Sequence, residues 1–291
     1  MVAAGFFAKT RSLLEMIKFS HTIFAFPFAL MGVVLAALAN RSLPGVGQIF
    51  WICLAMVGAR SGAMGLNRLI DARIDAENPR TAERHIPAGK ISVREAWLFI
   101  LVSLAVFLLA AWMLNPLCFK LAPVAIGLFV LYAYCKRFTA MAHLVLGICL
   151  AAAPIGAWIA LRGELALPVV FLGLAVLFWV AGFDIFYALQ DLDYDQEQGL
   201  HSIPSKLGAG GALRLARIFH CLMLFFLLLV LPGSGLGWIY LAGVAVVAGM
   251  LYYEHRLVRA DDLSRLDAAF FNMNGYISVT IFAFTLIDAI S

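Results

Sequence analysis

Apolar residues gather in long runs that alternate with short polar or charged connections. A run of about 18 or more apolar residues is long enough for a helix to cross the hydrocarbon core of a bilayer. By this criterion the chain contains nine candidate spans, at about residues 19–40, 47–67, 95–114, 117–135, 140–161, 167–189, 211–231, 235–254 and 266–289. We therefore predict an all-α integral membrane protein with nine transmembrane helices in a single domain over residues 1–291.

The composition supports a surface that faces lipid. Hydrophobic residues make up 64% of the chain and charged residues 13%, whereas a soluble domain has about 25% charged residues. No basic stripe with interleaved aromatic residues is present, so we expect no nucleic-acid partner. The five cysteines form no C-x-x-C pair and are interpreted as buried apolar side chains of a reduced protein.

The distribution of lysine and arginine predicts the orientation. These residues concentrate in the N-terminal segment and in the connections after the second, fourth, sixth and eighth spans. Only Arg41, Lys120 and Arg162 fall on the other side, and Arg60 lies inside a span. Because positive residues favour the cytoplasmic side, the N-terminus is expected in the cytoplasm and the C-terminus on the opposite side of a cell (inner) membrane. No small-residue cleavage site follows the first run, so it is interpreted as a retained span.

An acidic motif follows the second span. Asn67, Asp71 and Asp75 are spaced four residues apart, which places side chains one turn apart on one helix face. Like charges at this spacing repel, so a compensating cation is expected. Mg²⁺ prefers oxygen ligands and commonly binds through one or two carboxylates plus substrate phosphates.

A second acidic motif follows the sixth span, on the same predicted side of the membrane. It contains Asp191 and Asp195, with Asp193 between them. Two such clusters predict a pyrophosphate held through Mg²⁺ by Asn67, Asp71, Asp75, Asp191 and Asp195. Asp184 lies inside the span, seven residues before Asp191, and an ionisable residue at that depth indicates a functional site. Tyr187 is a further candidate for the same cavity.

Basic residues on the same predicted side are candidates for the pyrophosphate oxygens. They are Arg80 and Arg84 after the first motif, and Lys136 and Arg137 after the fourth span. Lys18 and His21, at the start of the first span, are candidates for contact with an acceptor carboxylate or hydroxyl. The other histidines lack metal-ligand spacing, and no zinc is expected.

The motifs together resemble the UbiA superfamily of membrane prenyltransferases. N-x-x-x-D-x-x-x-D is matched at Asn67, Asp71 and Asp75, and R-T-x-x-R at Arg80 and Arg84, with His85-Ile86 in place of the more common residues. Y-x-x-x-K is matched at Tyr132 and Lys136. D-x-x-Y-x-x-x-D-x-x-x-D is matched at Asp184, Tyr187, Asp191 and Asp195. The segment from Ile17 to Leu30 is similar to the bacterial subgroup that prenylates 4-hydroxybenzoate.

This resemblance implies a helical bundle around a central cavity that opens toward the cytoplasm. It also implies Mg²⁺-dependent transfer of a polyprenyl chain from its diphosphate to a ring carbon of 4-hydroxybenzoate or a similar hydroxyaryl carboxylate, in ubiquinone or menaquinone biosynthesis. A 1,4-dihydroxy-6-naphthoate acceptor is an alternative. Asp71 and Asp191 are both candidates for deprotonating the acceptor. No obligate protein partner is evident.

Two other classes of membrane protein share some of these features. A membrane transporter would also carry acidic residues within its helices, but here the acids cluster at one predicted face. A CDP-alcohol phosphotransferase would need a D-G-x-x-A-R sequence, which the chain lacks.

Overall fold

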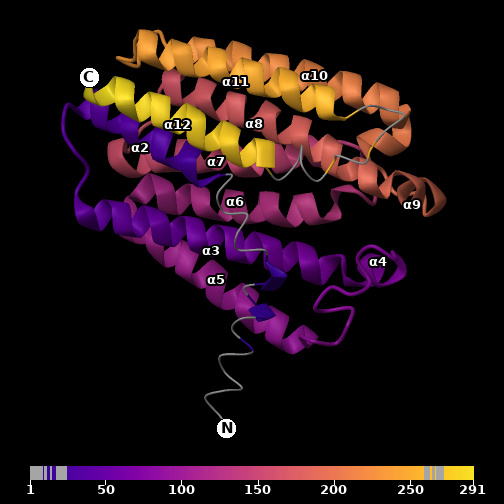
Figure 1. The fold of residues 1–291 in the computed structure, drawn as a ribbon. Helices are drawn as coiled ribbons and strands as arrows, with labels where there is room; N and C mark the ends of the chain where they lie inside the picture. Colours follow the sequence, from indigo (N-terminus) through magenta and orange to yellow (C-terminus); the bar gives the residue numbers. More distant parts are fainter. Residues whose placement is uncertain are drawn as a thin grey trace. The chain divides into compact units, whose positions relative to one another are not determined.

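The computed structural model describes residues 9, 12–13, 15–17, 25–258, 263, 266 and 272–291. Within these residues the chain is helical and contains no strand. Its helices are α2 (Phe26–Asn40), α3 (Val46–Ile70), α4 (Ala72–Glu77), α5 (Val93–Leu114), α6 (Pro116–Cys135), α7 (Ala142–Arg162), α8 (Leu167–Ala188), the 3₁₀ helix η2 (Leu189–Asp191), α9 (Leu192–Glu197), α10 (Ile203–Val230), α11 (Trp238–Leu257) and α12 (Asn274–Ile290) (Figure 1).

Each predicted span has a helix in the described part of the chain. Among the described residues, six helices are long and apolar enough to cross a membrane. They are α3, α5, α6, α7, α10 and the continuous stretch Leu167–Glu197. Two more apolar helices, α2 and α12, are shorter. The protein is therefore a helical membrane protein, while the number nine for the spans stays a prediction.

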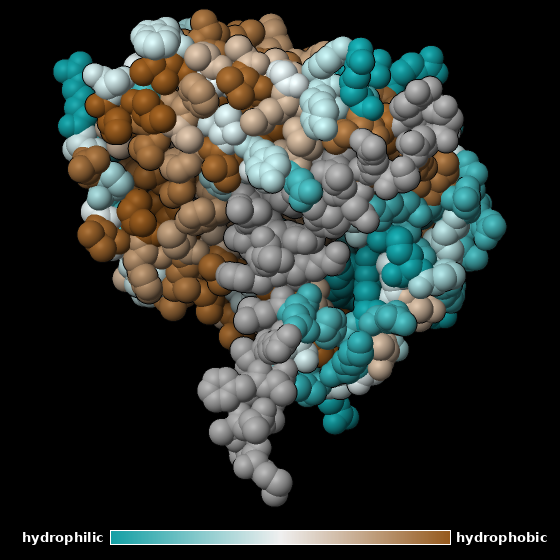
Figure 2. Space-filling view, viewed as in Figure 1, coloured by the Kyte–Doolittle hydropathy of each residue, from teal (hydrophilic) through white to brown (hydrophobic). Residues whose placement is uncertain are grey.

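Large apolar side chains remain exposed on the helices, as a lipid-facing surface requires. On α5, for example, Trp97 is 47% exposed, Leu101 59% and Trp112 64%. Hydrophobic residues cover much of the face shown in Figure 2, and hydrophilic residues gather toward helix ends. Such a pattern is unfavourable in water and suits a bilayer.

The chain divides into two compact units. Unit 1 comprises residues 1–22 and 50–134. In it α3 packs closely on α5, where a Cβ on Gly58 would lie 2.8 Å from the Ser103 carbonyl oxygen. Small residues permit this approach, which is typical of membrane helix pairs. A capping box starts α5, in which the Ser92 and Glu95 side chains accept each other's backbone N–H groups.

Unit 2 comprises residues 23–49 and 135–291. Helix α8 lies at its centre, and Trp179 on α8 is fully buried with its ring 4.8 Å from that of Phe28 on α2. Helix α7 approaches α8 at Gly147, where a Cβ would lie 2.4 Å from the Leu177 carbonyl oxygen.

One helix boundary in unit 2 differs from the prediction. Helix α10 begins at Ile203 rather than near residue 211. A capping box of Ser202 and Ser205 starts the helix, and Gly208, with φ 66°, kinks it before the apolar run begins. The apolar run alone does not reveal the polar first turns.

Candidate functional site

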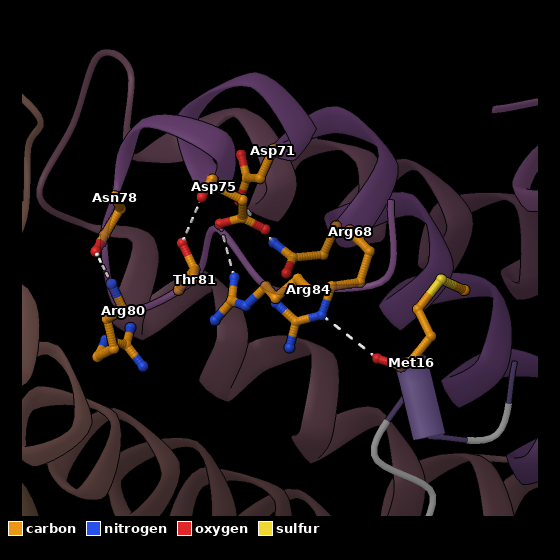
Figure 3. Close-up of polar contacts among 9 residues, drawn as sticks. Met16, Arg68, Asp71, Asp75, Asn78, Arg80, Thr81 and Arg84 are labelled. Atoms are coloured by element: carbon orange, nitrogen blue, oxygen red, sulfur yellow. Dashed lines mark hydrogen bonds and ion pairs between the residues drawn. The ribbon is translucent and has the colours of Figure 1, made fainter. Parts of the chain in front are cut away.

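The first acidic motif lies at the junction of α3 and α4 in unit 1. The Asp71 N–H donates to Asn67 O at 3.0 Å and the Asp75 N–H to Asp71 O at 2.8 Å, so helical hydrogen bonding continues across the junction. The Asn67 Nδ2 amide donates to Asp71 Oδ2 at 3.2 Å. Both aspartates are buried, with 4% of Asp71 and 3% of Asp75 exposed. The one-turn spacing therefore places these three residues on consecutive helical turns, and Figure 3 shows Asp71 and Asp75 close together.

The loop after α4 folds back onto Asp75. Arg84 Nη1 lies 2.7 Å from Asp75 Oδ1, and Thr81 Oγ1 donates to the Asp75 carbonyl oxygen at 3.0 Å (Figure 3). The second carboxylate oxygen, Asp75 Oδ2, is buried and has no hydrogen-bond partner among the described residues. One oxygen is thus held by a cation, and the other keeps its capacity for a ligand.

Arg80 differs from Arg84 in its placement. It is exposed, and its backbone N–H donates to Asn78 Oδ1 at 2.9 Å. Figure 3 shows it beside Asn78 and apart from the two aspartates.

A short N-terminal segment packs against α3. Met16 and Ile17 are buried in a cluster with Ile91 and Ala96. Arg68 on α3 is also buried, and its Nε donates to Met16 O at 3.5 Å. The candidates Lys18 and His21 lie outside the described residues.

The second acidic motif lies at the end of α8 in unit 2. The helix tightens into η2, which contains Asp191, and Asp195 follows in α9. After α9 the Leu200 N–H donates to the Asp195 carbonyl oxygen at 2.8 Å, and the His201 N–H donates to the Lys136 carbonyl oxygen at 2.8 Å. The backbone of Lys136 therefore contacts the connection that follows Asp195, and both Lys136 and Arg137 are half-buried.

Asp184 makes a contact that the sequence did not predict. Its Oδ2 lies 2.7 Å from His143 Nδ1 on α7, and the His143 side chain is only 4% exposed. The other ring nitrogen, His143 Nε2, accepts the backbone N–H of Ile203 at 3.3 Å. Tyr187, one turn after Asp184 on α8, is half-buried.

Arg60 is a functional candidate that the sequence reasoning noted only as lying within a span. Its Nε is buried without a hydrogen-bond partner in the described part of the chain. It precedes Asn67 by seven residues on α3, and this spacing places both on one helix face about 10 Å apart. An arginine inside a span is itself a signal for a functional site.

No group of three or more His, Cys, Asp and Glu side chains is positioned to hold a metal ion in the residues that the structure describes. Mg²⁺ commonly completes its coordination with substrate phosphates and water rather than with a cage of protein ligands. The buried, unpartnered Asp75 Oδ2 is a hard oxygen donor and fits such a partial site.

Comparisons with known proteins agree with this fold and these motifs. Residues 25–276 match the UbiA prenyltransferase family. The 4-hydroxybenzoate octaprenyltransferase of Vibrio cholerae is 31% identical over 252 residues, which cover 86% of this chain and 88% of that protein. The enzyme of the same name from Nitrosospira multiformis is 33% identical over 254 residues, covering 86% of each chain.

Solved structures show the same fold. The apo structure of a UbiA homolog from Aeropyrum pernix K1 superposes with a TM-score of 0.83 at 31% identity, covering 92% of this chain and 98% of that one. A UbiA homolog from Archaeoglobus fulgidus, solved with GPP and Mg²⁺, gives a TM-score of 0.68 at 19% identity, covering 96% and 100%. The chain belongs to the UbiA prenyltransferase family. It is a membrane enzyme that transfers prenyl groups.

Proposed function

We propose that this enzyme transfers a polyprenyl chain from an allylic polyprenyl diphosphate to a ring carbon of 4-hydroxybenzoate or a similar hydroxyaryl carboxylate. The reaction releases pyrophosphate, depends on Mg²⁺ and serves ubiquinone or menaquinone biosynthesis. A 1,4-dihydroxy-6-naphthoate acceptor is the alternative within the same chemistry. The names of the bacterial relatives support a hydroxybenzoate acceptor.

The observation that carries the proposal is the state of Asp75. Arg84 holds one carboxylate oxygen, and the other is buried without a hydrogen-bond partner among the described residues. Burying an unsatisfied carboxylate oxygen is costly unless a ligand completes it. Asp75, together with Asp71, which Asn67 orients, would hold a Mg²⁺ ion, and the ion would satisfy this oxygen.

The remaining candidate residues bind the Mg²⁺ ions or the diphosphate. Asp191 and Asp195 are the second set of Mg²⁺ ligands, and Arg80, Arg84, Lys136 and Arg137 neutralise the phosphate oxygens. When bound, Mg²⁺ supplies Lewis-acid stabilisation of the leaving diphosphate. The allylic C–O bond breaks with its electron pair going to the diphosphate oxygen. The acceptor ring carbon ortho to the hydroxyl then forms the new C–C bond and loses its proton, for which Asp71 and Asp191 are the candidates.

Arg60 supports the acceptor class. A guanidinium forms strong, bidentate pairs with carboxylates, above all where water is excluded. Arg60 and Asn67 share one face of α3, so a carboxylate bound at the guanidinium would lie about two helical turns from the first acidic motif. We assign Arg60 to the acceptor carboxylate, with Lys18, His21 and Tyr187 as further contacts around the acceptor.

The proposed topology follows the charge distribution. The N-terminus and both acidic motifs would face the cytoplasm at the cell inner membrane. The lipid tail would stay in apolar surroundings, which also keep water from the allylic cation.

Asp71→Ala and Asp191→Ala test the proposal in purified protein. Pyrophosphate release from a polyprenyl diphosphate and 4-hydroxybenzoate should fall by about two orders of magnitude or more in each. Glu77→Ala and Glu197→Ala replace exposed acids close to the same motifs and should retain activity. Full activity in both aspartate variants would refute the assignment.

A further inference from the structure

Three elements of unit 2 meet at His143. The ring lies on α7 and contacts the Asp184 carboxylate of α8 at 2.7 Å (Nδ1 to Oδ2). On its other side, Nε2 accepts the backbone N–H of Ile203, the first residue of α10, at 3.3 Å. The ring therefore connects a carboxylate inside α8 with the beginning of α10.

These two contacts define the protonation of the ring. A backbone N–H is always a donor, so Nε2 must accept and carries no proton. The proton of a neutral ring is then on Nδ1, from which it is donated to Asp184. Asp184 is therefore the acceptor of a defined hydrogen bond, and its role toward His143 needs an acceptor oxygen rather than a negative charge.

The contact with Ile203 completes the cap of α10. The first N–H groups of a helix lack partners within the helix. Pro204 has no N–H, and the Ser205 N–H donates to Ser202 Oγ at 3.1 Å. The Ile203 N–H would lack a partner without His143, so removing the ring releases the first residue of α10 from α7.

The start of α10 also controls the second acidic motif. Residues 198–202 join α9 to α10, and within them the Leu200 N–H donates to Asp195 O at 2.8 Å. The His201 N–H donates to Lys136 O at 2.8 Å. The residues adjoining Ile203 therefore contact both Asp195 and Lys136.

We infer that His143 and Asp184 are positioning residues for the diphosphate site. Asp184 orients His143, and His143 holds the start of α10. The fixed start of α10 in turn fixes residues 198–202, whose backbone contacts keep Asp195 and Lys136 in position relative to each other. Asp184 in this arrangement is neither a metal ligand nor the base that deprotonates the acceptor. The inference rests on the proposed function, because it assigns Asp195 and Lys136 to Mg²⁺ and diphosphate.

Three variants separate this role from a direct one. Asp184→Asn keeps an acceptor oxygen for His143, Asp184→Leu removes it, and His143→Phe keeps a ring but removes both nitrogens. We expect Asp184→Asn to stay within about threefold of the wild type in kcat and in the half-saturating Mg²⁺ concentration. Asp184→Leu and His143→Phe should raise that Mg²⁺ concentration by about 10–100-fold, the usual effect of losing a residue that orients metal ligands.

The measurement is the initial rate of pyrophosphate release against Mg²⁺ concentration at saturating substrates, with Asp191→Ala as the inactive reference. If Asp184→Asn is as inactive as Asp191→Ala, Asp184 acts through its charge and the inference is wrong. Unchanged Mg²⁺ dependence in Asp184→Leu and His143→Phe also overturns it. Should either of these two variants fail to fold, as judged by gel filtration in detergent, the result for Asp184→Asn still decides. An inactive wild-type enzyme would instead count against the proposed function itself.

Discussion

Arg84 holds Asp75 by one carboxylate oxygen, at 2.7 Å, and leaves the other buried without a hydrogen-bond partner among the described residues. Asp75 is the last residue of the predicted Mg²⁺ motif and lies in α4, and Arg84 reaches it from the loop that follows. This half-satisfied carboxylate is the structural basis for the magnesium and diphosphate chemistry proposed for the enzyme.

Replacing Arg84 with alanine should weaken Mg²⁺ binding. The substitution removes the group that orients Asp75 and leaves a buried carboxylate without its cation. We expect the half-saturating Mg²⁺ concentration to rise by about 10–100-fold, measured by pyrophosphate release. Arg73→Ala, which removes an exposed arginine from α4, is the matched control and should behave as the wild type. Equal effects of the two substitutions would indicate a general loss of positive charge.

Replacing Arg60 with leucine should affect the acceptor and not the prenyl donor. A hydrogen bond to a charged group contributes about 1.5–3 kcal/mol, which corresponds to a rise of roughly 10–150-fold in the KM for 4-hydroxybenzoate. The KM for the polyprenyl diphosphate should stay unchanged. For the methyl ester of the acceptor, which lacks the carboxylate charge, the wild type and the Arg60→Leu variant should have the same KM. An equal increase in KM for both substrates would contradict the assignment of Arg60.

Gly147 should be required for the packing of α7 on α8. Its Cβ would lie 2.4 Å from the Leu177 carbonyl oxygen, which belongs to the backbone and cannot rotate away. We expect Gly147→Ala to lower the free energy of unfolding by about 1–3 kcal/mol, measured by thermal unfolding in detergent. Gly156 lies on the same helix with open space at its Cβ position, so Gly156→Ala should be neutral or slightly stabilising. Equal stability of the two variants would contradict the close approach of α7 to α8 at Gly147.

Asp288 should stabilise the start of α11. Its carboxylate on α12 accepts the backbone N–H groups of Gly237 and Ile239, and no local side chain caps α11. Asp288→Ala should therefore cost about 0.5–2 kcal/mol, as the loss of a helix cap does. Asp288→Asn keeps one acceptor oxygen and should fall between the alanine variant and the wild type. A stability ranking with asparagine below alanine would argue against capping.

The sequence predicted the helices and the helical spacing of the first acidic motif. Long apolar runs and the spacing of Asn67, Asp71 and Asp75 are local properties, so they survive into the structure with small shifts. The capping box of Ser92 and Glu95 is local too. Helix α10 was predicted to begin too late because its first turns are polar and are stabilised by Ser202 and by the ring of His143 rather than by an apolar pattern.

The contacts that the sequence missed join residues far apart in the chain. His143 and Asp184 are 41 positions apart, and no periodicity links a histidine of one span to an aspartate of the next. The ion pair of Arg84 with Asp75 likewise depends on how the loop after α4 folds back onto that helix. Arg60 carried a signal in its depth within a span. That its buried Nε has no hydrogen-bond partner among the described residues became visible only in the structure.

The most direct test of the central claim uses the purified enzyme with a polyprenyl diphosphate and 4-hydroxybenzoate, followed by mass spectrometry of the aromatic product. We predict a ring-prenylated acid formed in equal amount to the released pyrophosphate, abolished by EDTA and restored by Mg²⁺. With 1,4-dihydroxy-6-naphthoate as the better substrate, the alternative acceptor would be correct. Pyrophosphate release without any prenylated aromatic product, or product formation that is indifferent to Mg²⁺ removal, would contradict the account.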